Sequence, residues 1–60
     1  MTGKGFIKKL MKDGWELDRV KGSHHILRKD GIILSVPVHG NTDLKPGLLN
    51  SLNKKAGYKK

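Results

Sequence analysis

The pattern of apolar residues along the chain predicts an α+β domain in which a helix, three antiparallel strands and a second helix follow one another. Three observations support this order: an apolar stripe with helical spacing near each end, runs of alternating character between them, and an Asp-Gly pair separating two of these runs. No linker or internal repeat divides the chain, so we expect one domain over residues 1–60. A three-stranded sheet with both helices on one face is the economical way to bury these stripes.

Residues 3–13 are expected to form an amphipathic helix. The apolar residues of this segment recur at helical spacing and would share one side of the helix: Phe6, Ile7, Leu10 and Met11. Thr2 has the side chain of a good N-cap, and Gly14 stands where a left-handed residue often ends a helix.

The middle of the chain carries the signals of strands and turns. Residues 15–20 alternate in polarity, which predicts a half-buried strand with Trp15 and Leu17 facing inward. The segment 21–23 has the composition of a turn, and a second strand is expected over residues 24–29.

A tight hairpin is expected at Asp30 and Gly31, because this pair between two β-favourable runs favours a type I′ turn. The third strand would then cover residues 32–38. Pro37 lacks a backbone N–H, so this strand should lie at the edge of the sheet or end there.

The second helix is expected to start at Pro46, since proline suits the first helical position. Leu44 and Leu49 are spaced as a hydrophobic staple around this start. Gly57 would end the helix, with Tyr58 packing back on it. The buried side of the helix would consist of Leu48, Leu49, Leu52 and Ala56.

Charge and composition narrow the class of protein. The chain has 13 Lys and Arg against 5 Asp and Glu, and this net charge of +8 favours phosphate-rich polymers as partners. Acidic proteins and membrane surfaces are the other candidates, and lysines that only keep the surface hydrated are the plainest alternative. The lack of cysteine excludes disulfides and cysteine-bound zinc.

Size and hydropathy exclude further classes. No apolar run approaches the ~20 residues of a membrane span, and the N-terminus lacks the apolar core of a signal peptide, so a cytoplasmic protein without a membrane role is expected. A domain of this length leaves little room for a cofactor cleft, so no small-molecule cofactor is expected.

The expected hairpin fixes which side chains share a face of the sheet. With a two-residue loop, the pairs are Lys29–Ile32, Leu27–Leu34, Ile26–Ser35, His25–Val36 and His24–Pro37. The more apolar face should lie under the helices, and His25 shares it. The other face would be open to solvent and carries His24, Ile26, Arg28, Ile33, Ser35 and His39.

An open face with a histidine beside Arg28 suits cleavage of RNA. The 2′-OH of RNA is a nucleophile adjacent to the scissile phosphate, an imidazole can take its proton, and cations can stabilise the charge of the phosphorane. This chemistry requires no metal. His24 and His25 point to opposite faces and cannot chelate one ion together, so no metal site is expected. A structural role is the alternative for each histidine, and His25 is expected at the margin of the core, held by a local hydrogen bond.

Four segments of the chain together resemble one known family. They are Lys-Gly-Ser-His-His-Ile at 21–26, Val-Pro-Val-His at 36–39, Leu-Lys-Pro-Gly at 44–47 and Lys-Ala-Gly-Tyr at 55–58. In this order and spacing they resemble the HicA (also called YcfA-like) toxins of type II toxin–antitoxin systems, over nearly the whole chain.

The resemblance implies a fold like that of double-stranded-RNA-binding domains and a metal-independent ribonuclease that cuts mRNA. It also implies neutralisation by a HicB antitoxin. The catalytic histidine of the family lies in the Gly-Ser-His segment, which corresponds by position to His24. Some relatives have one histidine aligned nearer His25, so that residue remains an alternative. His39 matches a histidine often found after the third strand, without a settled role.

The remaining site residues follow from charge and position. Lys21, Arg28 and Lys45 are candidate phosphate contacts. Gly22 and Ser23 would shape the turn that presents His24, and Ser23 could also orient the imidazole or bind phosphate. Two other functions stay open: a non-catalytic basic module that binds nucleic acid, and an inactive relic of a toxin.

Overall fold

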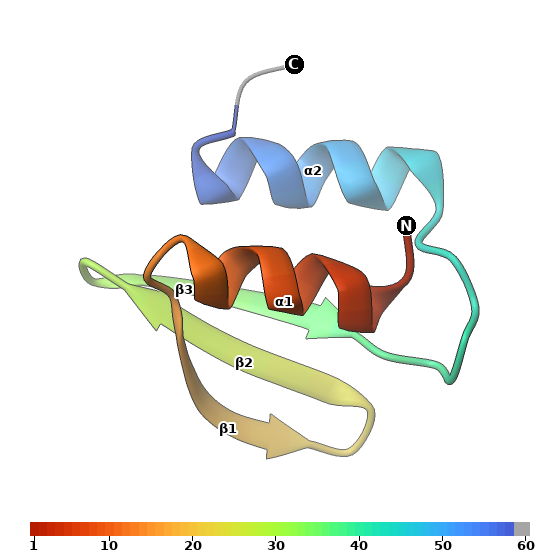
Figure 1. Ribbon diagram of the computed structural model, residues 1–60, viewed down its shortest axis with the longest axis horizontal. Helices are drawn as coiled ribbons and strands as arrows, with labels where there is room; N and C mark the ends of the chain where they lie inside the picture. The colour runs from red at the N-terminus through yellow and green to blue at the C-terminus, as the bar shows by residue number, and fades with distance from the viewer. Residues whose placement is uncertain (59–60) are drawn as a thin grey trace.

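The computed structural model describes residues 1–58 and confirms the expected order of elements. The three strands form one antiparallel sheet in the order β1-β2-β3. The fold is therefore α+β, as expected (Figure 1). Its elements are α1 (Gly3–Lys12), β1 (Glu16–Lys21), β2 (His24–Lys29), β3 (Ile32–Pro37) and α2 (Pro46–Ala56).

The core lies between the sheet and the two helices, which share one face of it. Helix α1 crosses the sheet, and α2 runs beside α1 (Figure 1). The opposite face of β2 and β3 exposes Arg28, Ile33 and Ser35, so it is open to solvent. The buried apolar residues come from both helices, the sheet and the α1–β1 connection: Phe6, Ile7, Leu10, Trp15, Leu27, Leu34, Val36 and Leu52.

Helix α1 is capped at both ends as the sequence predicts. The Thr2 hydroxyl accepts the backbone N–H of Gly5 at 3.1 Å. Gly14 follows the helix with a φ of 99°, which favours glycine. Met11, expected in the buried stripe, is instead exposed, because helical spacing puts it at the edge of the stripe that Phe6, Ile7 and Leu10 bury.

The β2–β3 hairpin has the predicted register at every pair, including His24 opposite Pro37 and His25 opposite Val36. Asp30 and Gly31 have φ values of 50° and 80°, and positive φ at both positions is the requirement of a type I′ turn. Strand β3 is an edge strand and ends at Pro37, as expected.

Strand β1 departs from the prediction. Trp15 is buried as expected, but Leu17 is 43% exposed. The core is built over β2 and β3, so the outer strand β1 extends beyond the cover of the helices. A bulge between Leu17 and Arg19 also breaks the strict alternation on which the prediction rested.

Helix α2 begins at Pro46 and is followed by Gly57, whose φ is 87°. Leu44 and Leu49 are half-buried against the core. Leu48, expected in the buried stripe, is 39% exposed. The ring of Tyr58 packs edge-on against Phe6 of α1, with 6.3 Å between the ring centroids. Tyr58 therefore contacts α1 as well as the last turn of α2.

Candidate active site

His24 is the first residue of β2, and its side chain is exposed. It pairs with Lys21 of β1 and with Pro37 of β3. Cross-strand partners share a face of the sheet, so His24 lies on the open face between these two neighbours. This position is the one that the hairpin register predicts.

The bulge in β1 determines that Lys21 joins His24. Leu17 pairs with Leu27 on the helix-bearing face, and strict alternation would turn Lys21 to that same face. The extra residue at the bulge shifts the alternation by one, so Arg19 and Lys21 point to the open side. The sequence offers no plain signal for this bulge, which is why the geometry of Lys21 could not be predicted.

The turn before His24 is anchored to the end of β3. The Ser23 carbonyl accepts a hydrogen bond from the Val38 N–H at 2.7 Å, which continues the ladder past Pro37. Gly22 has a φ of 62°, a conformation that glycine adopts without strain. The residues expected to present His24 therefore do form its turn.

His39 lies beyond the same end of β3 and is exposed. It stands two residues after Pro37, the cross-strand partner of His24. Lys45 follows at the N-cap of α2, and both side chains line one hollow at the β3 edge. Lys21, His24, His39 and Lys45 thus gather at one end of the sheet.

Arg28 shares the open face but not this end of it. It lies four residues beyond His24 along β2, which corresponds to about 13 Å at the rise of a strand. Its partner in β1 is Glu16. Arg28, Glu16 and Asp30 together line a hollow of about 280 Å³. The expectation of a histidine beside Arg28 is therefore wrong, because the two residues occupy opposite ends of one strand.

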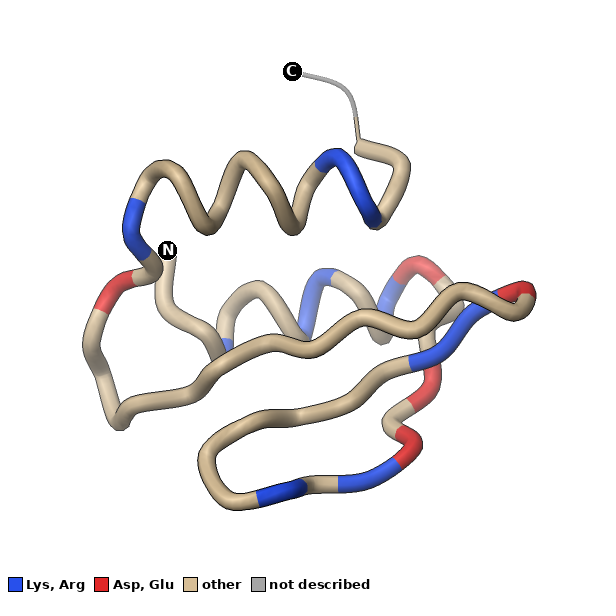
Figure 2. The backbone as a smooth tube through the Cα atoms, turned by 180° about the vertical axis from the view of Figure 1, so that it is seen from behind, with Lys and Arg blue, Asp and Glu red and all other residues tan. Residues whose placement is uncertain are grey.

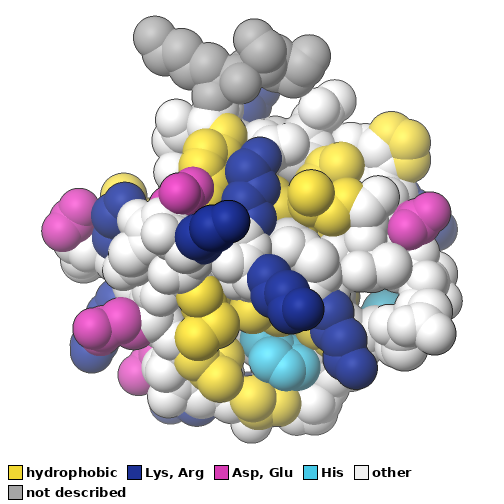
Figure 3. Space-filling view, in the orientation of Figure 1, with side chains coloured by type: hydrophobic (Ala, Val, Ile, Leu, Met, Phe, Trp, Pro, Cys, Tyr) yellow, Lys and Arg dark blue, Asp and Glu magenta, His cyan; other side chains and the backbone are white. Residues whose placement is uncertain are grey.

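His25 occupies the helix-bearing face, as expected, and is half-buried between Val20 and Val36. Its Nδ1 atom is buried without a hydrogen-bond partner among residues 1–58, so the expected local hydrogen bond is not made at that atom. Figure 3 shows a histidine on this face, set among hydrophobic and basic side chains.

The charges are distributed unevenly over the molecule. Acidic positions gather near the α1–β1 connection and the β2–β3 turn, and another lies in the connection to α2 (Figure 2). The end of the sheet that holds His24 carries Lys21, and Lys45 and Asp43 line the hollow at the nearby edge of β3. Basic positions also lie beside the acidic ones at the opposite end (Figure 2). Within residues 1–58, no three His, Asp or Glu side chains are placed to hold a metal ion.

The family of the chain can now be stated. The sequence model described as the HicA toxin of bacterial toxin–antitoxin systems matches residues 3–58. The chain belongs to the HicA toxin family. It is thus the toxin of a toxin–antitoxin system, and membership of the HicA family implies that its partner is an antitoxin. No curated protein matches the chain. In the described part of this HicA chain, no helix has the length and apolar character to cross a membrane.

Sequence reasoning missed the hollow at the β3 edge, which lies beside the gathered basic residues. Its walls come from β3, the following loop and the first turn of α2. Because these segments are separate in the sequence, no local motif predicts the hollow. In this HicA chain the exposure of Leu48, which the sequence pattern predicts in the buried stripe, reveals the hollow only in the structure.

Proposed function

We propose that the chain is an endoribonuclease that cleaves mRNA without a metal and that His24 is its catalytic residue. The observation that carries the proposal is the position of His24, exposed on an open sheet face between Lys21 and Pro37. Family membership supports a toxin, and the geometry supplies a base, cations and free access for a strand of RNA.

The proposed reaction is an internal transesterification. His24 takes the proton of the 2′-OH, and the 2′-oxygen attacks the adjacent phosphorus. The bond from phosphorus to the 5′-oxygen of the next nucleotide breaks, which leaves a cyclic phosphate and a 5′-hydroxyl. An imidazole suits this proton transfer because its ordinary titration lies near neutral pH. His39, which is exposed beyond the same end of β3, would give a proton to the leaving oxygen.

The cations of the site would hold the phosphates in place. Lys21, the cross-strand partner of His24, is the best placed to stabilise charge on the phosphorane. Lys45 would hold a neighbouring phosphate, and the Gly22–Ser23 turn brings backbone and hydroxyl donors near the same end. Arg28 would contact RNA only further along the strand. Both mRNA and a HicB-like antitoxin would meet this face in the cytoplasm.

Mutation of the two adjacent histidines tests the proposal. His24→Ala should lower the rate of mRNA cleavage in excess EDTA by about a hundredfold or more, while circular dichroism stays unchanged because the side chain is exposed. His25→Ala is the matched control. It should keep cleavage in the folded fraction and lower thermal stability, since it removes a half-buried ring.

Three results would contradict this assignment. A His24→Ala protein that cleaves normally, beside a folded and inactive His25→Ala protein, would move the site to the helix-bearing face. A wild-type protein that binds RNA but never cleaves it would instead favour the non-catalytic module or the inactive relic. Strict dependence on Mg²⁺ would exclude the histidine mechanism.

A further inference from the structure

A hollow of about 300 Å³ lies at the outer edge of β3. Three apolar side chains line it: Pro37 from β3, Leu44 from the connecting loop and Leu48 from the first turns of α2. Leu48 is 39% exposed although it belongs to a helix that packs on the core, because its side chain forms a wall of this hollow. His39, Thr42 and Lys45 add polar groups to the lining.

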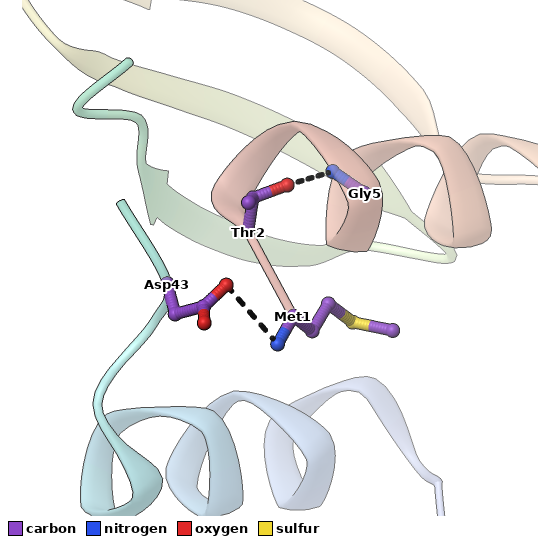
Figure 4. A network of polar contacts seen from close by, with 4 residues as sticks. All are labelled: Met1, Thr2, Gly5 and Asp43. Carbon is purple, nitrogen blue, oxygen red and sulfur yellow. Dashed lines mark hydrogen bonds and ion pairs between the residues drawn. The ribbon is translucent and has the colours of Figure 1, made fainter. Parts of the chain in front are cut away.

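The loop that forms the hollow is held in place on both sides. The Thr42 N–H donates to the His39 carbonyl at 3.0 Å, and the Leu44 N–H donates to the Met1 carbonyl at 2.8 Å. Thr2 and Asp43 form an isolated β-bridge, and the Asp43 carboxylate lies 3.5 Å from the N-terminal amine (Figure 4). The hollow is therefore preformed, so a ligand would not have to order the loop.

The hollow adjoins the proposed reaction site. Pro37 forms one of its walls, and this residue is the cross-strand partner of His24. His39 also lines the hollow. A strand of RNA whose phosphate lay at His24 and Lys21 would therefore bring the adjoining nucleotide to the mouth of the hollow.

The lining indicates which part of a nucleotide fits. The volume is at the lower end of the range for ligand sites, which suits a single flat group, and proline and leucine side chains can pack against the faces of a base. Asp43 also lines the hollow, and its negative charge offsets that of Lys45, so the lining has no excess of positive charge that would draw a phosphate inside. Its carboxylate can instead accept hydrogen bonds from the amino groups of adenine, cytosine or guanine.

We propose that this hollow binds one unpaired base of the RNA next to the cleaved phosphate and prefers bases that carry an amino group over uracil. The inference rests on the proposed ribonuclease function, which it deepens by adding a specificity pocket. Recognition of unstacked bases in single strands is the common way in which proteins read RNA sequence.

Binding can be measured separately from cleavage. Short homopolymers of A, C, G and U would be titrated into the full-length His24→Ala protein, with amide chemical shifts followed by NMR. The largest shifts are expected at Thr42, Leu44 and Leu48, with U binding weakest. Leu48→Ala, made in the same background, should weaken the binding of the A homopolymer about tenfold.

Leu17→Ala is the matched control, because Leu17 is a similarly exposed leucine on β1, away from the hollow. It should leave the affinity unchanged. In the protein with His24 intact, Leu48→Ala should also even out the sequence preference around cleavage sites, as read from the ends of the fragments.

The outcomes separate this inference from the proposed function. Base-dependent shifts at the hollow together with a wild-type protein that does not cleave would support the pocket and overturn the ribonuclease. Cleavage that depends on His24, with shifts spread over the basic surface and no effect of Leu48→Ala, would overturn the pocket alone. Equal affinity for all homopolymers would overturn it as well, and so would a hollow that takes up only a side chain of the antitoxin.

Discussion

Gly3 stands where helix α1 meets the end of β3, and the backbones there leave no room for a side chain. A Cβ atom at this position would collide with the Pro37 carbonyl oxygen and lie 3.2 Å from the Val38 Cα. Both neighbours are backbone atoms, so they cannot rotate away as a side chain could. Val38 also donates its N–H to Ser23 in the turn before His24, which links this contact to the proposed site.

Gly3→Ala should therefore destabilise the fold by about 2 kcal/mol through overpacking. Gly47→Ala is the control, because nothing lies within 4 Å of a Cβ at Gly47 in helix α2. There the change should stabilise by about 0.5 kcal/mol, since alanine favours the helix. Urea denaturation of the two variants measures both effects, and a Gly3→Ala protein as stable as the wild type would show that α1 can shift on the sheet.

At the scale of elements, the β2–β3 hairpin could be predicted and β1 could not. The Asp30–Gly31 turn fixes the hairpin register locally, and from that register followed the correct faces of His24 and His25. The exposure of Leu17 depends on how far the helices extend over the sheet. The bulge depends on the pairing of β1 with β2. Neither is encoded within β1 itself, so local patterning was insufficient there.

The two helix ends are connected by Tyr58, whose hydroxyl donates to the Asp13 carboxylate just after α1. The Lys9 amine also lies 4.4 Å from the centre of the ring. Burial, followed by the hydrogen bond and the negative charge of Asp13, raises the pKa of Tyr58 to about 12 from its usual 10.0. The folded state thus holds the phenolic proton more tightly than the unfolded chain.

This contact should stabilise the fold fully below pH about 10 and lose its effect as the pH rises through about 12. Absorbance of the ionised phenol, followed during a pH titration, measures the shift. Asp13→Asn should lower the pKa of Tyr58, although burial keeps it above the usual value. Tyr58→Phe should remove the loss of stability over this range. An unchanged pKa in Asp13→Asn would show that the carboxylate has no part in the shift.

At the scale of the whole molecule, the net charge of +8 suits an acidic partner that competes with RNA. An antitoxin that covers the end holding His24 and Lys21 should carry an acidic surface, and steering would then speed association. The association rate should fall about tenfold as salt is raised. Lys21→Gln should slow association more than Lys12→Gln, which removes the same charge from α1.

Labelling of His24 by diethyl pyrocarbonate gives the second readout of this prediction. The antitoxin should protect His24 from the reagent while RNA binding is lost. Equal labelling with and without an antitoxin that silences the toxin would exclude masking, and it would place the inhibitory contact elsewhere on the toxin.

Strand β1, which the helices do not cover, also affects whether copies of the chain aggregate. Within the described residues 1–58, its outer backbone edge has no partner strand in the sheet, and such an edge is a template for edge-to-edge aggregation. Here the bulge twists the strand out of the flat form that pairing needs, and charged side chains at Glu16, Asp18, Arg19 and Lys21 line the short edge. The same irregularity that turns Lys21 toward His24 therefore also discourages fibril growth whenever the toxin is free of its antitoxin.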